Sequence, residues 1–550
     1  MLTYVPSHLR IAQRPNEWPW ALLFLVFVWL WPGIISHDLW RPYEPTIYAA
    51  IQSVRQGNIL APTLFGEYYL PNSPLFLWLA SISQSLFSPW AMSSYTAVRL
   101  VTALFMAISL ACAGGAGREL LGKYHGRSVV LILIGTPGIM IFGHMMGNTP
   151  ILFAAICAFL YGIGLSQRKV WSAGILIAIS WILAFYSDNL PPLLFMGLIS
   201  ILLSFSESWK TRQFALSIAI AIAISLPLLI IYPYLLWQYH PDAFYYWHSQ
   251  HLFGALGGTE KIQLGFSSLR ILKNLLWFAM PAWILSIFTL YKIETLNKSI
   301  LYLTQLWILL AFILLSLQNY PQNYQLIYLL LPLTLLGAAK LDDMRRGIAA
   351  FINWFGIAIF GIAAVLVWLM FFAVNYGFPE KLSQMSAQFN PYFTPDWNYF
   401  PMILACAFTP IWLWAITRKN VRGRQAVTNW AAGMTLVWTL LMSLFLPWID
   451  SLKSYRPAVM AMHNSLGQEI KQELIDNKNC IISDNRHILT AWNEYGKIPV
   501  YSTNQSLLKC NYRLSIMNKE SLSYLMQNEI IWSGNRRGQR DDIIVLIYHN

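Results

Sequence analysis

The stretch HDLWRPYEPTIYAAIQSVRQGNILAPTLFGEYYLPNSPLFLWL, residues 37–79, directly follows the first long apolar run of the chain. It differs from that run because it contains both charged residues and prolines: Asp38, Arg41, Glu44, Arg55 and Glu67, with Pro42, Pro45, Pro62, Pro71 and Pro74. An amphipathic helix is predicted after Pro45, since apolar residues recur there every three or four positions: Ile47, Ala50, Ile51 and Val54. We expect this helix to lie on the membrane surface, with Trp40 and Tyr48 at headgroup depth.

Glu44 stands between two prolines at the expected start of this helix. Proline lacks the N–H group that a helix interior requires, so Pro42 and Pro45 mark the helix start and leave Glu44 just before it. A carboxylate there faces the amides of a helix N-terminus at the boundary between water and lipid. The position suits acid–base chemistry on a substrate with a lipid tail, and capping of the helix is the alternative role.

The composition indicates a protein that crosses a membrane many times. Of 550 residues, 57% are apolar and 11% are charged, whereas soluble domains carry about 25% charged residues. The net charge of +13 does not indicate nucleic-acid binding, because the basic residues are spread over short loops. We predict an all-α polytopic membrane domain over residues 1–449, with about thirteen spans centred near 27, 102, 136, 158, 179, 197, 225, 282, 308, 332, 363, 408 and 438.

The loops between these segments form two alternating sets that differ in basic content. One set, with the N-terminal segment, holds 18 Lys and Arg residues in short stretches: 118–127, 166–169, 207–212, 291–298, 340–347 and 418–424. The other set is longer and holds six: Arg41, Arg55, Lys261, Arg270, Lys273 and Lys381. The positive-inside rule then places the first set and the N-terminus in the cytoplasm. We expect loops 36–90, 238–273 and 376–398 to lie outside and to line an outward-facing cavity.

Residues 450–550 lack a spanning apolar run and are predicted to form a separate soluble domain on the outer side. Helix-like stretches at 457–475 and 519–528 alternate with strand-like segments at 480–484, 498–502 and 543–549, which predicts a small α/β fold. Cys480 and Cys510 lie in this domain, and an oxidising location permits a disulfide between them. Two free buried thiols are the alternative.

Motifs of several common enzyme classes are missing. The sequence contains no Walker loop, GxSxG, HExxH or paired CxxC motif, so it does not support an ATPase, an α/β-hydrolase or a zinc protease. His240, His248 and His251 share one predicted outer loop, but no acidic cluster accompanies them at fixed spacing. We expect packed or solvated histidines, and we predict neither a metal nor another cofactor.

The order of features after the first span resembles a known enzyme family. The motif L-W-x-P-x-E-P at 39–45 precedes the amphipathic helix, and G-x-x-x-x-P-x-x-x-G-x-x-Y at 57–69 and P-L-x-x-W-L at 74–79 follow it. This order is similar to that of family 39 of the integral-membrane glycosyltransferases, which have the GT-C fold and use polyprenyl-phosphate sugars. The family includes protein O-mannosyltransferases and, closer to this sequence, the bacterial aminoarabinose transferase that modifies lipid A.

The resemblance implies an inverting glycosyltransferase in the bacterial inner membrane. Its donor would be a polyprenyl-phosphate-linked sugar, and its acceptor lipid A, lipopolysaccharide or another cell-envelope glycan on the periplasmic side. Five residues depart from the family pattern. Tyr43 and Asn148 each replace an aspartate, Thr46 replaces an arginine, and Pro71-Asn72 stand where close relatives have Glu-Lys.

Sugar transfer from a lipid phosphate needs a cation for the leaving phosphate and, for a hydroxyl acceptor, a base. We predict Glu44 as the catalytic carboxylate. Arginine binds phosphate with a bidentate fork, and tyrosine hydroxyls donate hydrogen bonds to it. Substrate contacts are predicted at Arg41, Tyr43, Tyr48, Arg55, Tyr69, Asn72, Asn148, Asp188, Arg270, Tyr320 and Tyr324. Anchoring at the membrane interface is the alternative role for Arg270, Lys273 and the tyrosines.

Three functions other than sugar transfer to an envelope glycan are alternatives. A transporter is disfavoured because the spans hold almost no ionisable residues near their middles. A catalytically silent relative that binds lipid or glycan is a stronger alternative, because Tyr43 and Asn148 replace acids. A protein O-glycosyltransferase is the third, since the sequence does not specify the acceptor.

Overall fold

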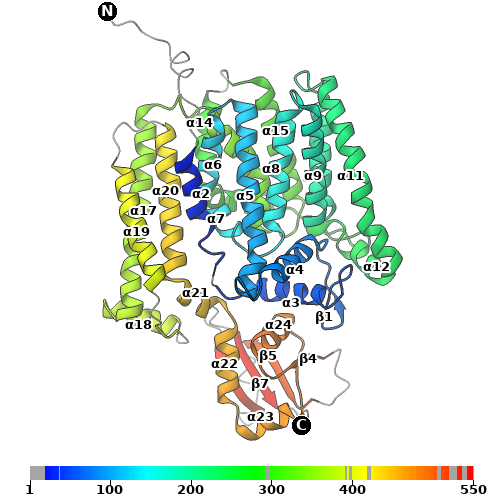
Figure 1. The fold of residues 1–550 in the computed structure, drawn as a ribbon, viewed down its shortest axis with the longest axis vertical. Coiled ribbons are helices and arrows are strands. Elements are labelled where there is room, and N and C mark those ends of the chain that lie inside the picture. Colours follow the sequence, from blue (N-terminus) through cyan, green and yellow to red (C-terminus); the bar gives the residue numbers. More distant parts are fainter. Residues whose placement is uncertain are drawn as a thin grey trace, which may run out of the picture.

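The computed structural model describes residues 19–35, 37–292, 294, 296–390, 393–395, 399–417, 423–476, 478–503, 510–518, 529–535 and 542–548. A bundle of helices forms the larger part, and a small domain with a β-sheet lies against one end of the bundle (Figure 1). The predicted fold class, a helical membrane domain with a small C-terminal α/β domain, is confirmed.

Eight helices in the described part of the chain are long and apolar enough to cross a membrane. They are α5 (Ser94–Leu121), α8 (Thr149–Ser166), α9 (Val170–Asp188), α11 (Arg212–Tyr239), α15 (Lys298–Ser316), α17 (Arg346–Tyr376), α19 (Tyr399–Ile416) and α20 (Gly423–Leu444). A ninth crossing results if α13 (Ser268–Phe278) and α14 (Ala282–Tyr291), bent by 100°, count as one span. The bend contains Pro281, which lacks the N–H group that would continue a helix.

Shorter apolar helices occupy the other four predicted span positions. They are α2 (Trp20–Leu30), α6 (His125–Ile134) with α7 (Pro137–Phe142), α10 (Leu190–Ser204), and η3 (Asn323–Leu326) with α16 (Ile327–Ala339). An 11-residue helix such as α2 is only about 16 Å long, roughly half of a bilayer core. The predicted count of thirteen spans is therefore not confirmed, although a helix or helix pair lies at each predicted centre.

The predicted outer loops gather at the end of the bundle that meets the small domain (Figure 1). In the described residues they contain α3 (Glu44–Arg55), β1 (Thr63–Leu64), β2 (Glu67–Tyr68), α4 (Leu75–Phe87), α12 (Pro241–Gln250), η1 (Gly254–Leu256) and α18 (Glu380–Phe389). Because these elements lie at one end, any chemistry carried by the loops is directed to one face of the membrane.

The predicted amphipathic helix exists as α3, but its setting differs from the prediction. It begins at Glu44, so Pro45 occupies its first turn, where a missing N–H group costs nothing. Tyr48 is buried inside the protein, where its hydroxyl accepts a hydrogen bond from Gln84 (3.3 Å) and its ring meets Tyr95 edge-on. The prediction that α3 places Tyr48 among lipid headgroups is wrong, because protein covers the apolar face of the helix.

The small domain is a five-stranded sheet covered by helices. The strands run in the order β4-β3-β5-β7-β6; β3 is parallel to β4 and β5, and β7 is antiparallel to β5 and β6. The elements are α22 (Arg456–Ser465), α23 (Gln468–Ile475), β3 (Ile481–Ser483), α24 (Arg486–Tyr495), β4 (Val500–Ser502), β5 (Tyr512–Asn518), β6 (Ile530–Asn535) and β7 (Asp542–Tyr548). Three of these strands were predicted, and the single helix-like stretch predicted at 457–475 consists of two helices, α22 and α23. The helix predicted at 519–528 lies outside the described residues.

A disulfide stabilises this domain internally, and a shared apolar core joins it to the bundle. Cys480 and Cys510 are bonded, as predicted, just before the neighbouring parallel strands β3 and β5. One continuous apolar cluster includes Ile51 of α3 and Trp492 of α24, both fully buried. The connecting helix α21 (Leu446–Lys453) crosses the boundary predicted at residue 450.

Candidate functional site

Glu44, the predicted catalytic carboxylate, is buried and fully engaged. Its Oε2 atom pairs with Arg99 Nη2 at 2.6 Å and accepts the backbone N–H of Trp40 at 2.9 Å, and its Oε1 accepts the N–H of Met146 at 3.1 Å. Burial alone would raise the pKa of Glu44, but the Arg99 charge and these hydrogen bonds hold it below its ordinary value. A low pKa and occupied oxygens favour a positioning role over the predicted role as a base.

Arg99, on α5, organises the segment that leads into α3. It is fully buried and donates from Nη1 to His37 O (2.8 Å) and from Nη2 to Asp38 O (2.7 Å), in addition to its pair with Glu44. The sequence interpretation missed this residue. An arginine within an apolar run is costly in a membrane, and that alone is a signal of a functional or organising position.

A second polar group lies where α9, η3 and the start of α3 approach one another. Asp188 ends α9 and is buried, and no described residue donates a hydrogen bond to its carboxylate or pairs with it. Tyr324 of η3 lies within electrostatic range of both Asp188 and Tyr43, and Tyr328 one turn later interacts with Asp188 and Tyr324. The Tyr43 side chain is 53% exposed. We call Tyr43, Asp188, Tyr324 and Tyr328 the polar cluster.

Two buried atoms near the ends of these helices lack a hydrogen-bond partner in the described structure. They are the Tyr328 hydroxyl of the polar cluster and Oδ1 of Asn148, the residue that precedes α8. Asn148 follows Met146 by two residues, and Met146 is bonded to Glu44. Unsatisfied buried polar atoms cost about 1–3 kcal/mol each, so both atoms are able to bind water or a polar ligand.

Asn189 connects three segments around Asp188. It is fully buried with φ at +59°, a conformation that asparagine tolerates better than most residues. Its side chain accepts from the backbone N–H of Ser73 (3.0 Å) and donates to the carbonyls of Pro71 (3.1 Å) and His251 (2.8 Å). The predicted Asn72 therefore lies in a turn that is tied to the residue next to Asp188.

Arg270 and Tyr320 are brought together at the outer edge of this region. The guanidinium of Arg270, on α13, lies 5.7 Å from the centre of the Tyr320 ring, and both side chains are exposed. One turn later on α13, Asn274 donates to Asn323 of η3 at 2.8 Å. The helix that carries Arg270 is thus fixed to the element that carries Tyr324.

The other predicted contacts lie elsewhere. Arg41 donates to Leu452 O at 3.0 Å beneath α3, and Arg55 is exposed at the end of α3, bonded to Gln52. Tyr69 packs under Arg486 of α24, and burial raises the pKa of its hydroxyl to about 12. Substrate contacts at Tyr48, Arg41, Arg55 and Tyr69 therefore gain no support from the polar cluster, because their partners belong to the fold.

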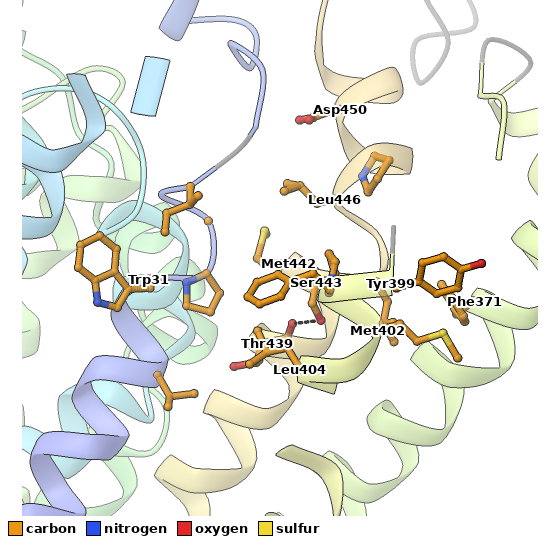
Figure 2. A pocket seen from close by; sticks show the side chains of 18 of the residues that line it. Trp31, Phe371, Tyr399, Met402, Leu404, Thr439, Met442, Ser443, Leu446 and Asp450 are labelled. Carbon is orange, nitrogen blue, oxygen red and sulfur yellow. Dashed lines mark hydrogen bonds between the residues drawn. The ribbon is translucent and has the colours of Figure 1, made fainter. Parts of the chain in front are cut away.

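An apolar groove of about 410 Å³ opens between the first and the last spans. Figure 2 shows Trp31 on one wall, Met442 and Ser443 of α20 behind, and Tyr399 and Phe371 on the far side. Its lining is mostly hydrocarbon and contains no Lys or Arg among the described residues. The groove is lined by spans more than by loops, so the prediction that loops 36–90 and 238–273 line a cavity does not apply to it.

Asp450, on α21, lies at one end of the groove lining (Figure 2). Its Oδ1 accepts from Trp40 Nε1 at 2.7 Å and its Oδ2 from the backbone N–H of Asp38 at 3.3 Å. Burial raises the pKa of Asp450 to about 7, and the Asp38 charge adds to this rise, whereas the two hydrogen bonds and the Arg99 charge oppose it. This residue was not foreseen, since its partners lie about 410 positions away in sequence.

Metal ligands are not assembled in the described part of the chain, where no three His, Cys, Asp or Glu side chains form a metal-binding group. Two of the three histidines of loop 238–273 make other side-chain contacts. His248 is bonded to Thr259 and His251 to Tyr246.

Comparison with known proteins supports one fold. Residues 71–237 match the family described as dolichyl-phosphate-mannose-protein mannosyltransferase, while no curated protein sequence matches the chain. The structure is similar to ArnT from Cupriavidus metallidurans bound to undecaprenyl phosphate, with a TM-score of 0.64 and 12% identity over 97% of this chain and 98% of that one. Its apo state gives a TM-score of 0.62 and 13% identity, over 96% and 97% of the two chains.

These likenesses confirm the resemblance drawn from the motifs at 39–79. The chain has the GT-C membrane glycosyltransferase fold of the ArnT structures. At 12–13% identity the structural likeness establishes the fold alone.

Proposed function

We propose that the protein is an inverting glycosyltransferase that moves a sugar from a polyprenyl-phosphate carrier to an acceptor at the outer face of a bacterial inner membrane. The observation that carries the proposal is the polar cluster. Among the described residues it combines a buried carboxylate without a partner, at the end of α9, and an unpartnered tyrosine hydroxyl in the first turn of α16. The ArnT-like fold and the family match over residues 71–237 support the same reaction class.

The donor phosphate fits best at Arg270. Its guanidinium is exposed, lies beside the Tyr320 ring and is carried by a helix bonded to η3, so a phosphate there would sit next to the cluster. Arginine meets a phosphate through two parallel N–H donors and stabilises the charge that develops as the phosphate leaves. The sugar would then lie toward Tyr43, Asp188 and Tyr324.

Asp188 is the proposed base. In the transfer step the acceptor oxygen attacks the anomeric carbon of the sugar, the bond from that carbon to the phosphate oxygen breaks, and polyprenyl phosphate leaves. The acceptor proton passes to the Asp188 carboxylate, whose oxygens have no other partner among the described residues. Glu44, held by Arg99, has no comparable freedom.

The acceptor is proposed to be a lipid-anchored glycan of the cell envelope, such as lipid A. The apolar groove supports a second lipid substrate, because it offers a hydrocarbon-lined space whose end, at Asp450, touches Trp40 in the segment that carries Tyr43. The predicted topology places this end and the C-terminal domain in the periplasm.

The test uses purified protein in nanodiscs with radiolabelled undecaprenyl phosphate and a panel of undecaprenyl-phosphate-linked sugars. We expect saturable binding of the carrier, and transfer of one labelled sugar to an envelope lipid extract. Arg270→Ala should weaken carrier binding roughly 10-fold or more, since it removes a charge-assisted contact. Lys381→Ala, an exposed cation on α18 at the same end, is the matched control and should bind as the wild type does.

A catalytically silent lipid-binding relative is the second candidate function. It is favoured by Tyr43 and Asn148, since the family has an aspartate at both positions and the cluster retains one carboxylate among its described members. Carrier binding that depends on Arg270, without transfer of any sugar in the panel, would establish this alternative. Absence of carrier binding would reject both.

A further inference from the structure

The soluble domain makes an ion pair and hydrogen bonds with residues 38–41, in the segment that carries Tyr43. Arg456, at the start of α22, donates from Nε and Nη2 to the two carboxylate oxygens of Asp38, each at 2.8 Å. Ser454 donates to the same carboxylate at 3.0 Å. The Arg456 guanidinium also lies 4.9 Å from the centre of the Tyr495 ring, so two elements of the domain converge on Asp38.

Backbone N–H groups of residues 38–41 also donate hydrogen bonds to residues of the C-terminal part of the chain. The N–H of Arg41 donates to Lys453 O at 3.1 Å, and that of Leu39 donates to the Tyr495 hydroxyl at 3.3 Å. The Asp450 carboxylate accepts hydrogen bonds from the backbone N–H of Asp38 and from the indole N–H of Trp40. Three of the four backbone N–H groups of residues 38–41 therefore donate to residues more than 400 positions away, and the fourth, that of Trp40, donates to Glu44.

The opposite side of this segment is held by the bundle. Arg99 binds the carbonyls of His37 and Asp38 and the carboxylate of Glu44, as described above. Residues 37–44 are thus clamped between a buried cation of α5 and the start of the soluble domain. Tyr43, near the end of this clamped segment, is more than half exposed and lies within electrostatic range of Tyr324, another member of the polar cluster.

Further contacts anchor the domain around the clamp. Tyr95 of α5 donates to Glu494 of α24 at 2.7 Å, and Arg486 of α24 pairs with Glu67 at 3.0 Å. These contacts fix α24 to the bundle on both sides of α3. A shift of the domain would therefore be transmitted directly to residues 37–44, since few of their hydrogen bonds stay within the segment.

We infer that the soluble domain positions residues 37–44 for sugar transfer through the Asp38–Arg456 pair, which makes Arg456 a positioning residue of the membrane-embedded site. The effect on transfer rests on the proposed function, whereas the effect on the segment itself does not. Arg456 touches neither the polar cluster nor Arg270 among the described contacts, so it acts through Asp38. A domain outside the membrane thereby sets the geometry of a site between the spans.

The experiment compares Arg456→Asp, Asp38→Arg and the double variant that exchanges the two charges. Hydrogen exchange of peptides covering 37–44 should accelerate roughly 10-fold or more in each single variant, because local opening is no longer opposed by the pair. The exchanged pair should restore slow exchange. Arg513→Asp breaks an exposed pair with Asp484 within the same domain and is the matched control, expected to leave these peptides unchanged.

Kinetics provide the second readout. With undecaprenyl phosphate binding retained, kcat for transfer should fall roughly 10-fold or more in the single variants and recover in the exchanged pair, as expected for lost orientation. Unchanged exchange at 37–44 in Arg456→Asp would overturn the inference. So would faster exchange over the whole soluble domain without recovery in the double variant, which indicates a merely structural role. If exchange responds as expected but the wild type transfers no sugar, the proposed function fails and the clamp stands.

Discussion

Two buried carboxylates near the same end of the bundle have opposite surroundings. Glu44 has a buried arginine and two backbone N–H donors, whereas Asp188 has no partner among the described residues. Asp450 lies between these extremes, with two donors and no paired cation. A charged group buried with a full set of partners contributes to architecture, while one left without partners costs stability and is retained for binding or chemistry.

This contrast moves the expected chemistry away from the residue that the motif singled out. The segment 37–44 is a frame whose polar groups have partners among the described residues, and the polar cluster is the region that we propose binds the ligand. Each of the following changes either breaks the contrast or sharpens it.

Replacing Asp188 by Asn should have the largest effect. If Asp188 accepts the acceptor proton, transfer falls by roughly 10²–10⁴-fold while thermal stability is kept or improved, because the variant removes an uncompensated buried charge. Transfer assays and thermal unfolding check both expectations. Asp242→Asn, an exposed acid on α12, is the control. Undiminished sugar transfer by Asp188→Asn would show that Asp188 is not the base.

Replacing Arg99 by Met should destabilise the fold most. The change leaves the Glu44 carboxylate buried without its cation and frees two carbonyls, which costs about 3–5 kcal/mol. Thermal unfolding in detergent measures the loss. Adding Glu44→Gln to Arg99→Met should recover part of it, since no charge is then stranded. An Arg99→Met protein as stable as the wild type would contradict the view of 37–44 as a frame.

Glu44→Gln alone tests the motif-based prediction directly. We expect a loss of about 1–3 kcal/mol in stability, from weaker hydrogen bonds to Arg99 and Met146. Transfer per folded molecule should change less than about 10-fold, far below the effect of removing a general base. Specific activity corrected for the folded fraction is the measurement. A fall comparable to that of Asp188→Asn would return the catalytic role to Glu44.

Asp450→Asn should have the smallest effect on transfer, and its effect on stability should depend on pH. Burial raises the Asp450 pKa from 3.8 to about 7, so the folded state binds this proton more tightly than the unfolded state. The wild type therefore loses stability relative to Asp450→Asn as pH rises from about 4 to about 7, by at most about 1.4 kcal/mol per pH unit. Unfolding midpoints of both proteins across this range give the slope. A difference independent of pH would show that the pKa of Asp450 does not rise on folding.

Much of the fold follows from local sequence properties. Apolar length placed a helix or helix pair at every predicted centre, and the three-to-four-residue spacing after Pro45 predicted α3. Periodicity did not show which neighbour would cover the apolar face of α3, so Tyr48 was assigned to lipid although protein buries it. Strands β5 and β6 and helix α24 were also missed, since short elements are stabilised by the sheet they join.

The sequence by itself determined the membrane class, the order of apolar segments, the soluble C-terminal α/β domain and the cysteine pair, because each depends on composition or on spacing along the chain. Only the tertiary structure decided which charged groups are satisfied. Arg99 reaches Glu44 across 55 positions and Arg456 reaches Asp38 across 418. These partners decide whether a buried carboxylate has a structural or a chemical role. The pairing of distant charges depends on how the chain packs, and no local sequence pattern specifies it.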